Sequence, residues 1–153
     1  MTHTTNVILT EKFEALKPLK VLMAGFLATG VMTAFMLIAP FIGLPEMNVG
    51  AFLGALMGDH MVLGWVMHMA IGIGLAFVYV MFFNHTIPVI NDTLRGMLFG
   101  IVAFIIAQMI LMIINLTGLL TWDEKQGVML MIFGNCVAHM LYGTVLGTFF
   151  KNK

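Results

Sequence analysis

Four long apolar runs constrain this chain more than any other feature of its sequence. They extend over Leu19 to Ile42, Met61 to Phe83, Leu94 to Leu116 and Val128 to Phe150. Because a helix rises about 1.5 Å per residue, each run is long enough to cross a hydrocarbon core about 30 Å thick. Only 9% of the residues are charged, whereas an average soluble domain has about 25%. The sequence therefore predicts an all-α integral membrane protein with four transmembrane helices.

The segments outside these runs are short and form no separate domain. Residues 1–18 are a polar N-terminal tail, residues 19–150 a single transmembrane domain, and residues 151–153 the C-terminal end. Between the first two runs, glycine recurs at every fourth position and Asn48 stands where it could cap a helix. We therefore expect a short outer helix that lies in the membrane interface, with close packing on the bundle as the alternative.

Basic residues are distributed unequally between the two sides of the predicted bundle. One side holds Lys12, Lys17, Lys20, Arg95, Lys151 and Lys153, and the other holds Lys125. Because cytoplasmic loops carry an excess of lysine and arginine, both termini are predicted to be cytoplasmic. The outer side instead gathers Glu46, Asp59, Asp123 and Glu124, whose role the sequence leaves open.

Two histidines lie inside apolar runs and have similar neighbours. His68 begins the stretch HMAIGIGLAF, and His139, 71 residues later, begins HMLYGTVLGTF. Glycines lie on the same helical face as each histidine. They are Gly64 and Gly72, four residues before and after His68, and Gly143 and Gly147, four and eight residues after His139. Membrane helices approach one another along stripes of small residues, so we expect both histidines to face the bundle interior.

The repeated histidine surroundings indicate an internal repeat. The second and fourth runs align at an offset of 71 residues, and the first and third at an offset of 75. Each copy, about 19–83 and about 94–150, would be a two-helix hairpin that crosses the membrane twice. Both copies then have the same orientation, with a pseudo-twofold axis along the membrane normal. The glycines expected at helix contacts are Gly25, Gly72, Gly100 and Gly143.

An ionisable side chain within a membrane is a candidate functional residue. The simplest interpretation is structural, with each imidazole bonded to a polar group of a neighbouring helix; the available residues are Thr29, Thr33, Gln108 and Asn135. A second is ligation of haem b by His68 and His139, with Lys20 and Arg95 near its propionates. A third is Cu(I) binding, because Cys136 precedes His139 by three residues and the chain has 16 methionines.

Several protein classes are not indicated by the sequence. It has no glycine-rich phosphate loop, no G-x-S-x-G, no H-E-x-x-H and no paired C-x-x-C. The few basic residues do not form a nucleic-acid surface. The spans carry no acidic or basic residue near their centres, which argues against a proton-coupled transporter. We therefore expect neither enzymatic activity nor a nucleic-acid partner.

Four segments carry a resemblance to a known type of protein: GFLATGVMTAFML, GLPEMNVGAFLGALMG, GWVMHMAIG and HMLYGTVLG. Together they resemble a family of small, uncharacterised four-helix bacterial inner-membrane proteins, with W-x-x-H-x-x-x-G in the second span and H-x-x-[YF]-G-x-x-x-G in the fourth. These motifs fall here on Trp65, His68 and Gly72, and on His139, Tyr142, Gly143 and Gly147. The resemblance implies the fold and a bacterial inner-membrane location, and it brings no activity.

The small size and the missing catalytic groups together favour a non-catalytic role. With 153 residues and almost no extramembrane mass, the chain is expected to be a small subunit of a larger inner-membrane assembly, such as a respiratory complex. Its expected partners are the lipid bilayer and other membrane-protein subunits. A haem b electron-transfer protein and a Cu(I)-handling protein remain as alternatives.

Overall fold

The computed structural model describes residues 17–84, 91–118 and 127–151, and their regular structure is entirely helical. The elements are α2 (Pro18–Ile38), η1 (Ala39–Ile42), α3 (Val49–Ala55), α4 (Met61–Val78), η2 (Tyr79–Phe83), α5 (Asp92–Leu116) and α6 (Val128–Phe149). Four of the helical segments are long and apolar enough to cross a membrane: α2 with η1, α4 with η2, α5, and α6. The predicted membrane character and four-helix character are confirmed.

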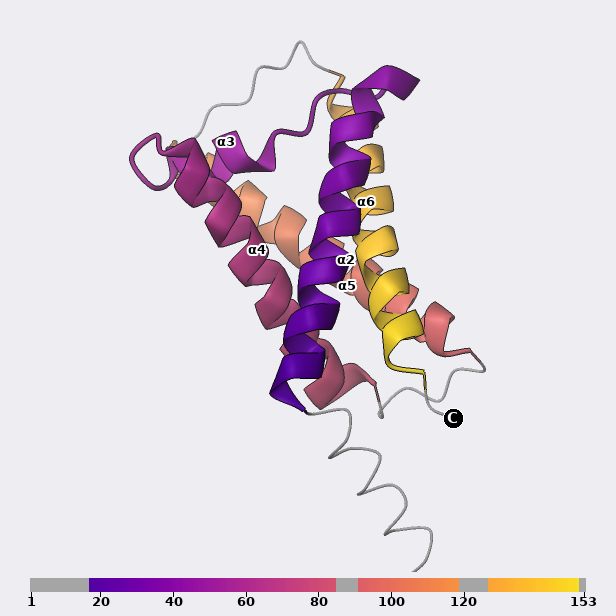
Figure 1. Ribbon diagram of the computed structural model, residues 1–153. Helices are drawn as coiled ribbons and strands as arrows, with labels where there is room; N and C mark the ends of the chain where they lie inside the picture. Colours follow the sequence, from indigo (N-terminus) through magenta and orange to yellow (C-terminus); the bar gives the residue numbers. More distant parts are fainter. Residues whose placement is uncertain (1–16, 85–90, 119–126, 152–153) are drawn as a thin grey trace, which may run out of the picture.

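The helices pack in the order α4, α2, α6, α5 (Figure 1). The central helices α2 and α6 lie side by side, α4 packs on α2, and α5 packs on α6. The start of α2 and the end of α6 lie at one end of the bundle, which we call the terminal end, and α3 lies at the opposite end, which we call the α3 end (Figure 1). The expected tail up to residue 16, together with Asp123, Glu124, Lys125 and Lys153, falls outside the described residues.

The first span begins and ends at residues suited to these positions. Pro18 occupies the first position of α2, where a backbone N–H would have no partner within the helix. At the other end the span tightens into the 3-10 turn η1 and stops at Gly43. The φ angle of Gly43 is 85°, a left-handed conformation that glycine adopts without steric cost.

The short helix α3 has the predicted cap and packs on the bundle. The side chain of Asn48 accepts a hydrogen bond from the backbone N–H of Ala51 at 2.9 Å. Gly50 and Gly54 are buried and face α4, where their backbones lie against Gly64. The expected short helix between the first two spans is therefore present, and it packs on α4.

The terminal end is held by an aromatic cluster around Tyr79. The ring of Tyr79 is fully buried and contacts the rings of Phe83, Phe99 and Phe150, with a centroid distance of 5.2 Å to Phe99. Here the second span changes from α to π geometry, because the N–H of Asn84 bonds to the carbonyl of Tyr79 five residues earlier. The sequence predicted this span's end at Phe83 and did not predict its π turn.

Helix α5 is buried only in the half that lies at the terminal end. Its buried residues are Arg95, Gly96, Phe99, Gly100 and Ala103. From residue 104 to its end, none of its side chains is buried. In Figure 1, α5 crosses behind α2 and α6, so that its far end lies away from the start of α6. The two helices of this hairpin therefore separate toward the α3 end.

Candidate functional site

His68 lies on α4 and is only 7% exposed. Its Nε2 is hydrogen bonded to the hydroxyl of Thr33 on α2, with 3.2 Å between the two atoms. The indole of Trp65 stands edge-on to the imidazole, with 6.0 Å between ring centroids. One nitrogen of this histidine is therefore engaged by a neighbouring helix.

His139 lies on α6 and is 9% exposed. Its Nδ1 is 2.9 Å from the backbone carbonyl oxygen of Asn135, one turn earlier on the same helix. Because a carbonyl oxygen can only accept, Nδ1 carries the proton. In the neutral ring, Nε2 is then an acceptor. The ring of Phe104, on α5, contacts this imidazole edge-on at a centroid distance of 5.8 Å.

The two histidines lie in one region of the bundle. Close by, the buried hydroxyl of Tyr142 on α6 donates a hydrogen bond of 2.6 Å to the backbone carbonyl of Gly72 on α4. This bond joins the two helices that carry the histidines. The sequence placed Tyr142 in a motif and did not indicate this hydrogen bond. Its spacing of four residues from Ala138 and Leu146, which are also buried, could have indicated that it faces the bundle interior.

Replacing Tyr142 by phenylalanine should remove this link while keeping the aromatic ring. We expect the free energy of unfolding in detergent micelles to fall by about 1 kcal/mol, because interhelical hydrogen bonds in membrane proteins contribute about that amount. Stepwise titration with sodium dodecyl sulfate would measure the change. Thr148→Val is the control, since within the described part of the chain the hydroxyl of Thr148 bonds carbonyls of its own helix. An equal effect of both substitutions would contradict the assigned role.

The six glycines of the predicted packing stripes all lie where helices or helix ends approach one another. Gly25 of α2 faces α4, and Gly72 of α4 faces Thr29 of α2. Gly64 of α4 faces α3. Gly100 of α5 faces the backbone of α6, and Gly143 and Gly147 of α6 face the backbone of α5. In each case a methyl group would overlap the neighbouring element, so these glycines allow close helix packing.

The close helix packing at these glycines also concerns the haem interpretation. The space beside the glycines that flank both histidines is occupied by neighbouring helices. Lys20, considered for a propionate, lies with its ammonium 5.1 Å from the centroid of the Phe150 ring. Arg95 lies near the level of Gly147, about 12 Å along α6 from His139. The described residues therefore give the haem interpretation no support.

No metal cluster is evident within residues 17–84, 91–118 and 127–151, where no three His, Cys, Asp or Glu side chains come together. Cys136 is a free, partly buried thiol. The described residues therefore give the copper interpretation no support from these ligand types.

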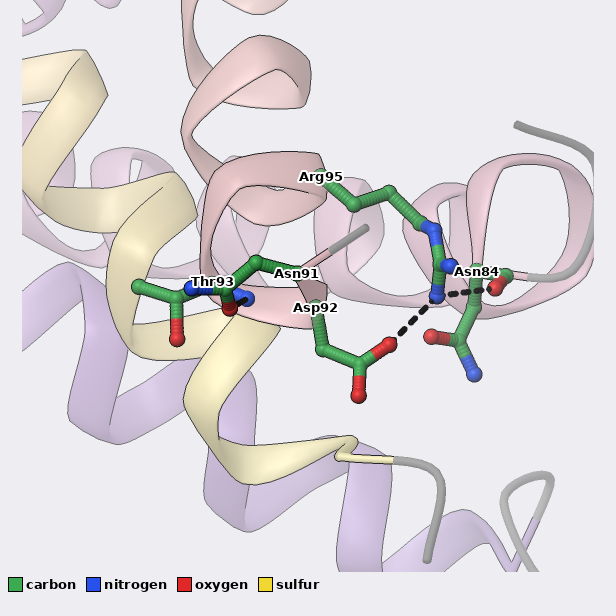
Figure 2. A network of polar contacts seen from close by, with 5 residues as sticks. All are labelled: Asn84, Asn91, Asp92, Thr93 and Arg95. Atoms are coloured by element: carbon green, nitrogen blue, oxygen red, sulfur yellow. Dashed lines mark hydrogen bonds and ion pairs between the residues drawn. The ribbon is translucent and has the colours of Figure 1, made fainter. Parts of the chain in front are cut away.

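A second polar site joins the ends of α4 and α5 at the terminal end. The guanidinium of Arg95 donates from its Nη1 to the backbone carbonyl of Asn84 at 2.8 Å and to the carboxylate of Asp92 at 2.7 Å. Figure 2 shows Arg95 between these two acceptors, with Asn91 and Thr93 at the start of α5. The side chain of Asn91 caps α5 by accepting from the N–H of Thr93 at 2.9 Å. Arg95 thus stabilises a helix C-terminus, whose carbonyls favour a cation.

Comparison with known proteins gives a family and no activity. The model of a family of unknown function, DUF6789, matches residues 16–152. No curated protein and no solved structure matches the chain significantly. The match covers almost all of the chain, including both histidines and every described helix. This protein therefore belongs to the family of unknown function DUF6789.

Proposed function

We propose that this protein is a small non-catalytic subunit of a larger assembly in the bacterial inner membrane, such as a respiratory complex. The proposal is supported chiefly by the half of α5 that follows Ala103, where no residue is buried. Its exposed apolar side chains are Ile105, Ile106, Met109, Ile110, Met112, Ile113 and Leu116. This half-helix leaves its own bundle and offers a neighbouring membrane helix an extended surface to pack on.

The distribution of charge supports the proposed orientation. Lys17, Lys20, Arg95 and Lys151 all belong to helix ends at the terminal end. By the positive-inside rule we place this end, and with it both chain termini, in the cytoplasm.

We further propose that the two hairpins are copies of one unit. Contacts of the α2–α4 hairpin recur in the α5–α6 hairpin at one constant shift in sequence. Gly25 against Gly72 corresponds to Gly96 against Gly143. The contact of Thr33 with His68 corresponds to that of Phe104 with His139. These contacts align the first span with the third at an offset of 71 residues. The offset of 75 residues predicted from the sequence lies one helical turn further along the third span.

The subunit proposal is tested in native membranes. A tagged chain expressed at its natural level and extracted in mild detergent should migrate well above its own mass of 16.9 kDa, together with partners in fixed stoichiometry. Met109→Trp should release these partners, because Met109 is 61% exposed on the free half of α5.

The matched control is Met23→Trp, since Met23 is a similarly exposed methionine on α2. This variant should leave the assembly intact. Migration as a single chain in native extracts would overturn the proposal. The visible spectrum of the same preparation should be featureless, and a Soret band would instead favour the haem alternative.

A further inference from the structure

Lys20 and Phe150 join the start of α2 to the end of α6 at the terminal end. The ammonium of Lys20 lies 5.1 Å from the centroid of the Phe150 ring, which is within the range of a cation–π interaction. The Phe150 side chain is buried, and its ring also contacts the ring of Tyr79 at a centroid distance of 6.1 Å. Because this ring is packed on the core of the bundle, its attraction restricts the ammonium to one place.

The ammonium of Lys20 keeps its capacity to bond a further group. An ammonium carries three N–H donors, whereas a phenyl ring attracts it through the charge distribution of its face and has no oxygen or nitrogen acceptor. Lys20 is half-buried and lies two residues after Pro18, the first residue of α2, which is about 3 Å along the helix. Its charge is therefore held at the boundary of the hydrocarbon core, where the lipid headgroups begin.

A second lysine belongs to the same corner of the bundle. Lys151 is exposed and directly follows Phe150, so the Cα atoms of these two residues are about 3.8 Å apart. Of the acidic residues in the described part of the chain, only Asp92 belongs to a helix end at the terminal end, and its carboxylate bonds Arg95 at 2.7 Å. Within the described residues, the corner that Lys20 and Lys151 form therefore has an excess of positive charge.

An exposed apolar stripe continues from Lys20 along α2. Leu27 and Val31 lie seven and eleven residues after Lys20, about two and three helical turns, so the three residues share one face of the helix. Both apolar side chains are exposed. A phospholipid with a negatively charged headgroup matches the two parts, because its phosphate pairs with the lysines and its acyl chains cover the apolar stripe.

We propose that Lys20 and Lys151 bind the phosphate of an anionic phospholipid whose acyl chains lie along Leu27 and Val31. Phe150 is a positioning residue in this site, since it holds the ammonium of Lys20 through its ring. The site discriminates against zwitterionic lipids, because basic groups near the membrane surface attract lipids with a net negative charge. It is formed by one chain and goes beyond the proposed subunit role.

The test uses the full chain in a non-ionic detergent and native mass spectrometry, which separates the free chain from the chain with one bound lipid. The probes are dioleoylphosphatidylglycerol and dioleoylphosphatidylcholine, which have the same acyl chains and differ in net charge. We expect saturable binding of phosphatidylglycerol, about fivefold tighter than that of phosphatidylcholine and weaker as the salt concentration rises. Equal affinities for the two lipids would overturn the site.

Substitutions of Lys20 identify its part in the site. Lys20→Gln should weaken binding of phosphatidylglycerol about fivefold, which corresponds to about 1 kcal/mol, and should leave phosphatidylcholine binding unchanged. Lys20→Arg keeps both the charge and the attraction to the Phe150 ring, so it should retain the affinity. Loss of affinity in Lys20→Arg equal to that in Lys20→Gln would contradict recognition by charge.

Lys17→Gln is the matched control, because Lys17 is an exposed lysine that directly precedes α2. It removes the same charge from the same end of the bundle and should change the affinity much less than Lys20→Gln. Equal losses in the two variants would show a diffuse attraction to the whole charged end and would overturn the site.

Competition distinguishes a lipid from a free phosphate. Glycerol 1-phosphate carries the phosphate without acyl chains, so an equimolar amount should not displace phosphatidylglycerol. Displacement would overturn the lipid as the ligand. All these measurements use the isolated chain, so a failure of the lipid site leaves the subunit role standing, and migration as a single chain in native extracts leaves the lipid site standing.

Discussion

Replacing Gly143 by alanine is expected to lower the free energy of unfolding by about 3 kcal/mol, the upper part of the range for overpacked cores. A methyl group at this position would overlap the carbonyl oxygen of Gly96 and would lie 2.7 Å from the backbone nitrogen of Gly100. Both neighbours are backbone atoms of α5, so no side chain can rotate away. The two helices would have to separate along their closest contact, and unfolding in detergent micelles measures the cost.

The control for Gly143 is a glycine in the same kind of helix with free space around it. Gly74 is exposed on α4 and has no atom within 4 Å of the position that a methyl group would take. Gly74→Ala should therefore leave stability unchanged or raise it by up to about 1 kcal/mol, because alanine is the better helix former. If both substitutions destabilise the protein equally, close backbone packing is not what Gly143 provides.

Replacing Arg95 by leucine is expected to have an effect of similar size, about 3 kcal/mol of lost stability. The side chain of Arg95 is 10% exposed and that of Asp92 is 20% exposed, so both members of the ion pair are largely removed from water. Leucine would leave the Asp92 charge and the Asn84 carbonyl without the cation that bonds them both. Urea or dodecyl sulfate titration of the purified protein would measure the loss.

Two further variants separate the charge of Arg95 from its geometry. Arg95→Lys keeps the charge but loses the planar donor group, so we expect it to recover only part of the stability. Lys151→Leu removes an exposed charge at the same end of the bundle and should change stability by less than about 0.5 kcal/mol. A loss for Arg95→Leu no larger than that for Lys151→Leu would contradict a structural role of the buried guanidinium.

The spans could be predicted closely because length and hydropathy are local properties of the sequence. The predicted runs and the observed spans Pro18–Ile42, Met61–Phe83, Asp92–Leu116 and Val128–Phe149 agree to within two residues at each end. Every backbone group in a bilayer must be bonded within its own helix, so an apolar run of this length has few alternatives. The cap at Asn48 was predictable for the same reason, since it acts within one turn.

The partners of the histidines could not be predicted from the sequence. The sequence offered both Thr33 and Asn135 as hydrogen-bond partners of the histidines, yet the two residues bond through different groups. Thr33 supplies a hydroxyl from another helix, whereas Asn135 supplies its backbone carbonyl from the same helix. Which group bonds to which ring nitrogen depends on the rotation and depth of neighbouring helices, and these are set by packing.

The sequence by itself determined that the chain forms four membrane-spanning helices, and it marked the small residues along which they approach one another. Only the tertiary structure decided that α2 and α6 form the centre, that α3 packs on α4, and that α5 leaves the bundle beyond Ala103. The physical reason is that lipid and protein interiors are similarly apolar. Hydropathy therefore shows that a helix enters the membrane, while the choice of its neighbours depends on the shape of the packed surfaces.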